Sequence, residues 1–185
     1  MKLKLSKRSG EKKSELTQIR FRKDIPAVIY QNGKPGENAI VNGSEFHTIL
    51  RGLQKGYLPT TIFELDLDGK KSKAIVKDIQ YHPTTYQILH LDFLLLSDDV
   101  PVDVKVPISF EGQADCVGIK LGGFLRPVIR HVRVRCLPKD IPTDFKVDVR
   151  SLAIGQEKRI RDIEMSDAIR SLVRPQEVVV VIAKR

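Results

Sequence analysis

The chain has 185 residues, of which 41% are hydrophobic and 30% charged, a balance typical of soluble globular proteins and too apolar for general disorder. Its 32 Lys and Arg against 23 Asp and Glu give a net charge of +9, which fits an acidic partner, most often nucleic acid. No apolar run approaches the ~20 residues that span a bilayer, and no long apolar stretch follows the basic N-terminus. The 2 cysteines make no C-x-x-C pair, so we expect a cytosolic, reduced protein.

The positive charge is concentrated at the start of the chain. Residues 1–30 hold nine basic and three acidic side chains, whereas residues 31–95 hold seven of each sign. The remaining excess of +3 lies in residues 96–185. We therefore expect a phosphate backbone to meet the N-terminal segment first; a merely solvated basic surface is the alternative.

The first elements follow from alternation and polarity. Residues 2–8 alternate apolar and polar side chains, which predicts a strand with Leu3 and Leu5 toward a core. Lys2, Lys4 and Arg8 would then share the opposite face. The polar residues 9–15 predict a loop that leads into a short helix near residues 16–22.

A strand and a helix are predicted next. Residues 26–30 form an apolar run that predicts a strand, and the run begins at a proline, which is tolerated at the first residue of a strand. Turn signals follow at 32–33 and 35–36. Ser44 is the expected N-cap of a helix that ends near Gly56.

The clearest hairpin signal follows that helix. Residues 63–67 alternate, Asp68 and Gly69 predict the turn, and residues 73–81 return. A third strand is expected over 86–95. Several short strands with one helix predict a small, mainly antiparallel barrel or curled sheet over residues 1–95.

The second half is predicted to be a separate β-rich domain. The acidic segment 97–101 ends in a proline and marks a boundary. Alternation predicts strands over 102–106 and 145–149, and the apolar run 177–183 suits a buried strand. Alternation also predicts a strand over residues 129–136, with three basic side chains on one face: His131, Arg133 and Arg135. This face is either a second RNA contact or an ordinary solvated strand face, and the pattern favours the solvated face.

The most suggestive polar residues lie on the predicted third strand. The apolar residues of 89–95 should face the core, which leaves His90 and Asp92 side by side on the outer face. That pairing suits an imidazole N–H donor oriented by a carboxylate. Gln80 and His82 join the same face only if even-numbered residues of the two strands are paired with each other, so that the residue numbers of each pair add up to an even number. Alternation alone does not determine this register.

Several interpretations of this cluster compete. A catalytic dyad would need a nucleophile brought near by the fold, since no G-x-S-x-G motif occurs. A metal site would need a more compact ligand spacing than His82, His90 and Asp92 provide. A polar strand face could instead bind the wide, shallow minor groove of RNA, and a solvated His–Asp pair is the simplest alternative. Aromatic content of 6% without tryptophan favours structured over single-stranded RNA, and we expect no enzyme activity and no cofactor.

Three motifs in the N-terminal half carry a family resemblance: Arg20-x-x-x-Asp24-Ile25-Pro26-Ala27-Val28-Ile29-Tyr30, Asp78-Ile79-Gln80-x-His82-Pro83 and His90-x-Asp92-Phe93. They resemble the family of the bacterial large-subunit ribosomal protein twenty-five, also called the general stress protein CTC family, which binds 5S rRNA. The second half resembles the long form of that family, on Val106-Pro107-Ile108, Gly118 with Gly122-Gly123, Cys136-Leu137-Pro138-x-Asp140-Ile141-Pro142 and Asp148-Val149-x-x-Leu152-x-Ile154-Gly155.

The resemblance implies both a fold and a partner. The fold would be mainly β: a six-stranded antiparallel β-barrel with one or two short helices over residues 1–95, then a β-rich C-terminal domain over 96–185. The barrel would dock on the loop E region of 5S rRNA in the central protuberance of the large ribosomal subunit, beside neighbouring subunit components. The protein would thus be cytoplasmic and ribosomal, and we expect neither a membrane partner nor a small-molecule substrate.

The resemblance also implies which side chains bind RNA or hold that surface. These are Arg8, Arg20, Tyr30, Gln80, His82, His90 and Asp92, to which the basic loop adds Lys12 and Lys13. The alternative function is a free stress-related RNA-binding protein or RNA chaperone that does not reside on the ribosome.

Overall fold

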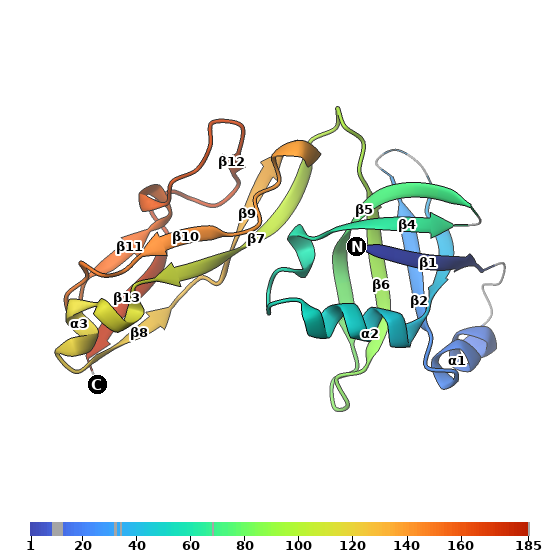
Figure 1. The fold of residues 1–185 in the computed structure, drawn as a ribbon, viewed down its shortest axis with the longest axis horizontal. Coiled ribbons are helices and arrows are strands. Elements are labelled where there is room, and N and C mark those ends of the chain that lie inside the picture. The colour runs from blue at the N-terminus through green and yellow to red at the C-terminus, as the bar shows by residue number, and fades with distance from the viewer. Residues whose placement is uncertain (9–12, 32, 34, 68, 185) are drawn as a thin grey trace. The chain divides into compact units, whose positions relative to one another are not determined.

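The computed structural model describes residues 1–8, 13–31, 33, 35–67 and 69–184. It divides into two compact units, Met1–Val100 and Pro101–Arg185, and the division falls within the acidic segment 97–101 (Figure 1).

The first unit is a closed six-stranded barrel in the order β1-β3-β2-β6-β5-β4, as the resemblance implied. Its strands are β1 (Lys2–Lys7), β2 (Ile25–Tyr30), β3 (Glu37–Val41), β4 (Ile62–Leu67), β5 (Lys70–Tyr81) and β6 (Ile88–Leu95). The barrel is mainly antiparallel, as predicted, but β1 pairs with β4 and β2 with β6 in parallel, which the term antiparallel barrel did not include. Parallel partners need long crossover connections, and dozens of residues separate the two strands of each pair.

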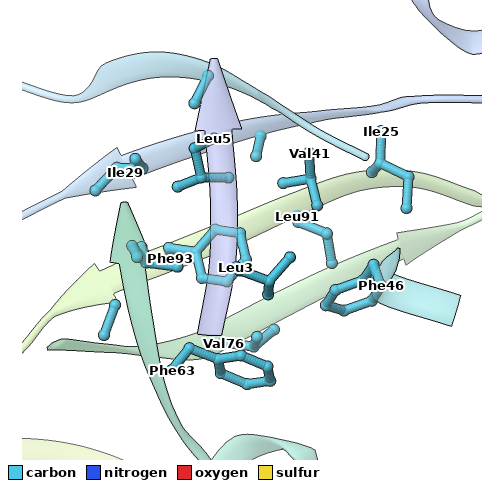
Figure 2. Packing of buried hydrophobic residues seen from close by; sticks show 14 of the residues in the cluster. Leu3, Leu5, Ile25, Ile29, Val41, Phe46, Phe63, Val76, Leu91 and Phe93 are labelled. Atoms are coloured by element: carbon cyan, nitrogen blue, oxygen red, sulfur yellow. The ribbon is translucent and has the colours of Figure 1, made fainter. Parts of the chain in front are cut away.

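The barrel interior is filled by alternate strand residues, as the patterns of residues 2–8 and 63–67 predicted. Leu3 and Leu65 are almost completely buried, at 1% and 0% exposure. Three aromatic rings meet in this core (Figure 2). The ring centroid of Phe63 lies 6.5 Å from that of Phe46 and 6.2 Å from that of Phe93, which it meets edge to face. Such aromatic pairs stabilise the core beyond the area that the rings bury, by about 0.5–1.5 kcal/mol each.

Two α-helices accompany the barrel, α1 (Lys13–Phe21) and α2 (Gly43–Gly52). Helix α1 begins earlier than predicted. Helix α2 is capped by Asn42, whose side chain accepts from the Glu45 N–H at 3.1 Å, so the expected Ser44 cap and the stop at Gly56 are wrong. Both Asn and Ser cap helices well, so residue type alone did not distinguish them. Gly43, the first residue of α2, has no room for a side chain, because a Cβ there would lie 1.9 Å from the Lys23 carbonyl oxygen.

The second unit contains two sheets, and its strands include those predicted around 102–106, 131–136, 145–149 and 177–183. One sheet has the order β10-β7-β9-β12 and the other β11-β13-β8. The elements are β7 (Val102–Glu111), α3 (Val117–Lys120), β8 (Gly123–Pro127), β9 (His131–Cys136), β10 (Phe145–Asp148), β11 (Glu157–Arg159), β12 (Arg170–Ser171) and β13 (Val178–Lys184). Short 3-10 helices lie at Leu58–Thr60, Gln113–Asp115, Pro138–Asp140 and Ile160–Asp162.

Both cysteines belong to the second unit, where Cys116 and Cys136 are buried and free. Burial, with the nearby charges of Asp140 and Asp103, raises the pKa of the Cys136 thiol. The two thiols therefore act as small apolar groups of the core. In the part of the chain that the structure describes, no helix is long and apolar enough to cross a membrane.

Candidate nucleic-acid interface

A polar face runs along the outside of the barrel where β5 and β6 pair. His90 Nδ1 lies 2.7 Å from Asp92 Oδ1, and the two side chains are 20% and 32% exposed. Leu91, between them, is completely buried. The predicted side-by-side arrangement is therefore confirmed, and the carboxylate, which can only accept, holds the imidazole with Nδ1–H as the donor.

The register of β5 places Gln80 directly opposite His90. Two even-numbered residues are thus paired, so Gln80 joins the face of His90 and Asp92, which alternation alone did not determine. The ladder shifts just beyond this pair, where Tyr81 is opposite Ile88. His82 lies past the end of β5, and its Nδ1 accepts hydrogen bonds from the backbone N–H groups of the turn that follows, at 3.4 and 3.3 Å. Its ring therefore holds that turn and makes no hydrogen bond to the Gln80–His90 pair.

Tyr30 ends strand β2 beside this face. Burial raises the pKa of its phenol, and the negative charges of Asp92 and Asp78 raise it further. Asp78 lies directly opposite Asp92, and like charges in opposed positions destabilise a sheet. Asp78 therefore belongs to this face as well, although the sequence did not indicate it as a site residue. It lies two residues before Gln80 on the same strand.

Helix α1 contributes an anchored cation next to His90. The guanidinium of Arg20 donates to the carbonyl oxygen of Leu89 from Nη2 at 3.2 Å and from Nε at 3.4 Å. Leu89 directly precedes His90, at the shift in the β5·β6 ladder. The contact holds α1 against β6 and leaves a positive charge at the edge of the polar face.

Arg8 supplies a second cation on the other side. Its backbone N–H donates to the Asn38 carbonyl at 3.0 Å, which continues the β1·β3 ladder by one residue. Asn38 is opposite Val28, and Val28 is opposite Asp92, so Arg8 and Asp92 share one row across four strands. Nε and Nη1 of Arg8 are buried and have no hydrogen-bond partner among the residues that the structure describes. Buried donors without an acceptor are costly and favour an external acceptor.

The remaining basic residues are placed differently. Lys2 and Lys4 lie opposite Glu64 and Asp66 in the parallel β1·β4 ladder, so acidic residues neighbour both lysines. Lys12 lies outside the described residues. Lys13 begins α1, but its side chain lies outside the described part as well.

The hydrolase and metal interpretations find no support around His90. The hydrogen bond that its ring makes within the described residues is the one to Asp92, and no hydroxyl or thiol pairs with it there. Groups of three or more His, Cys, Asp or Glu that could hold a metal ion are likewise absent from the described part of the chain.

The charges of this outer face, which we call the barrel face, have a definite order. Two carboxylates, Asp78 and Asp92, lie at its centre with Gln80 and His90, and the cations Arg8 and Arg20 flank them. Carboxylates repel phosphate but accept from base amino groups, as Asp and Glu do from cytosine N4. The arrangement therefore suits base edges at the centre and phosphates at the flanks.

Comparison with known proteins covers the whole chain. Residues 3–93 match the model of the Ribosomal L25p family, and residues 101–185 match that of the Ribosomal protein TL5, C-terminal domain. Three relatives carry the name Large ribosomal subunit protein bL25, and all align over 185 residues, 100% of both chains. They come from Chlamydia abortus at 45% identity, Chlamydia muridarum at 43% and Chlamydia trachomatis serovar A at 44%. The chain is therefore a member of the bL25 family of large ribosomal subunit proteins, in its long, two-domain form.

Proposed function

We infer that this protein is a structural, non-enzymatic component of the large ribosomal subunit whose barrel binds 5S rRNA, at the loop E region in the central protuberance. The observation that carries the inference is the barrel face, where an oriented His90–Asp92 pair lies opposite Gln80 and between two cations. Family membership supports the ribosomal location, since the curated relatives are large-subunit proteins by name.

Each part of the barrel face has a role in this proposal. Asp92 fixes the His90 tautomer, so the ring presents one defined group to a base edge or a 2′-hydroxyl. Tyr30, whose pKa is raised, remains a neutral hydroxyl at physiological pH and can donate. Arg8 offers buried donors that find no acceptor among the described residues, and a phosphate oxygen would satisfy them.

Two substitutions separate discrimination from charge. His90→Ala should lower the preference for 5S rRNA over tRNA by about 1–3 kcal/mol, by analogy with base-edge pairs in DNA. Lys2→Ala removes one positive charge next to Glu64 in the β1·β4 ladder, and should weaken binding to both RNAs slightly and equally. Equal losses on both RNAs for His90→Ala would contradict the proposed readout.

Residence on the ribosome has its own test. The full chain should sediment with large subunits at physiological salt. A chain that binds 5S rRNA selectively but stays free of subunits in cell extracts would instead be the stress-related RNA-binding protein of the alternative.

A further inference from the structure

Strand β9 of the second unit presents a basic face. Val132 and Val134 are fully buried, while the alternate residues His131, Arg133 and Arg135 are exposed, as their spacing predicted. The ladders to the two neighbouring strands add three more charged side chains to this outward side. We call the resulting surface the β9 face; it consists of Asp103, Lys105, His131, Arg133, Arg135 and Arg170.

One cation of the β9 face is neutralised within the fold. Arg135 donates to both carboxylate oxygens of Asp103, from Nε at 2.6 Å and from Nη2 at 2.9 Å. This hydrogen bond and the charge of Asp103 raise the pKa of Arg135. Among the described residues no ion pair neutralises the other basic groups of the face: Lys105, His131, Arg133 and Arg170.

The strand register makes this excess of positive charge unfavourable for the stability of the isolated protein. Lys105 of β7 lies directly opposite Arg133, and like charges in this position destabilise a sheet. The same sheet compensates a cation elsewhere, since Lys146 on β10 contacts Glu111 at 3.0 Å. The sheet therefore opposes two cations on its central strands, β7 and β9, and pairs one cation at its β10 edge, which suits an anionic partner over the central strands.

We propose that the β9 face is a second RNA contact, which binds the phosphates of helical RNA without reading sequence. It lies in a different unit from the barrel face and does not depend on 5S rRNA as the barrel's ligand. The paired residues of β7, β9 and β12 include no Phe, Tyr or Trp, and His131 supplies a single imidazole ring, so these residues do not form an extended stacking platform for single strands. Double-stranded RNA, in contrast, is bound largely by its shape and through phosphate and 2′-hydroxyl contacts.

A charge reversal tests the proposal in the full chain. Arg133→Glu would create an opposite-charge pair with Lys105 and should raise the melting temperature, while it removes a phosphate contact. Binding to a blunt-ended RNA duplex of arbitrary sequence should weaken at least about eightfold at about 0.1 M salt, and the salt slope should fall by about 1.

Lys146→Glu is the matched control, because it makes the same change in net charge within the same sheet. It places a carboxylate beside Glu111, so the melting temperature should fall while duplex binding changes little. The barrel is identical in the two variants, so their difference reports the β9 face alone. Equal duplex affinities in the two variants, or wild-type affinity for Arg133→Glu, would overturn the proposal. A failure of 5S rRNA recognition would leave this comparison unaffected.

Discussion

The barrel face and the β9 face both place charged side chains on the outside of a sheet, but they hold them differently. On the barrel face, His90 is fixed by Asp92 and Arg20 by the Leu89 carbonyl. On the β9 face, Arg133 and Lys105 oppose each other, and within the described residues no ion pair links them to an acid. The first arrangement orients its donors and acceptors; the second only concentrates charge.

That difference teaches what each surface can distinguish. Oriented polar groups lose binding when the wrong base edge faces them, because their desolvated partners stay unpaired. Unpaired cations bind any phosphate backbone and release counterions, so their contribution depends on salt and not on sequence. We therefore expect selectivity to come from the barrel and additional affinity from the second unit.

The strongest way to separate the two surfaces is to unfold the barrel. Phe93 is completely buried, and its ring meets Phe63 edge to face, so Phe93→Ala should destabilise the barrel by about 3–5 kcal/mol. The measurement is the binding of fluorescence-labelled 5S rRNA and of a labelled RNA duplex at increasing denaturant concentration. The variant should lose its preference for 5S rRNA at low denaturant while it still binds the duplex. Loss of both activities in one transition would contradict independent surfaces.

A double-mutant cycle sharpens the account of the barrel face. His90→Ala and Asp92→Asn should be coupled by about 0.5–3 kcal/mol in 5S rRNA preference, because each residue acts through the other. The control cycle combines His90→Ala with Arg133→Gln, which lie in different units and should be additive. Additive effects in the first cycle would mean that Asp92 does not orient the ring.

A smaller effect is expected from releasing the neutralised cation of the β9 face. Asp103→Asn removes the ionised partner of Arg135, so duplex affinity should rise and the salt slope should steepen by up to about 1. The preference for 5S rRNA should not change. Asp115→Asn, which releases Lys120 outside the β9 face, is the control, and an equal rise there would point to net charge alone.

The smallest expected effect concerns pH. Because the pKa of Tyr30 is raised above its usual 10.0, the phenol stays protonated, and its part in 5S rRNA preference should be constant between about pH 7 and 9. Binding titrations of the wild type and of Tyr30→Phe measure that part. The stability that Tyr30 contributes is present below pH 10.0 and is lost as the pH rises through its folded-state pKa. A difference between the two proteins that declines near neutral pH would contradict this assignment.

Local patterns predicted much of this architecture. Alternation identified β1, the β4–β5 hairpin and β9 with the correct faces, because a side-chain period of two follows directly from strand geometry. Strand β3 was missed, since Glu37–Val41 follows two turn signals and buries only Ala39 and Val41. The parallel ladders were also missed, because pairing between distant segments leaves no local pattern.

The barrel face was predictable in its centre but not at its margins. Alternation within one strand brought His90 and Asp92 together, whereas Gln80 required the β5·β6 register. The hydrogen bond of Arg20 to Leu89 and the row that joins Arg8 to Asp92 depend on three-dimensional packing. Such contacts arise from the closed barrel, which no spacing rule encodes.

The most direct test of the central claim is a competition experiment with the full chain. Binding to 5S rRNA is measured with tRNA as competitor at low and at physiological salt. Our account predicts that the preference for 5S rRNA survives the higher salt, because oriented polar groups carry it, while total affinity falls. Binding that tRNA abolishes at either salt concentration would contradict the account and reduce the barrel face to a charged surface.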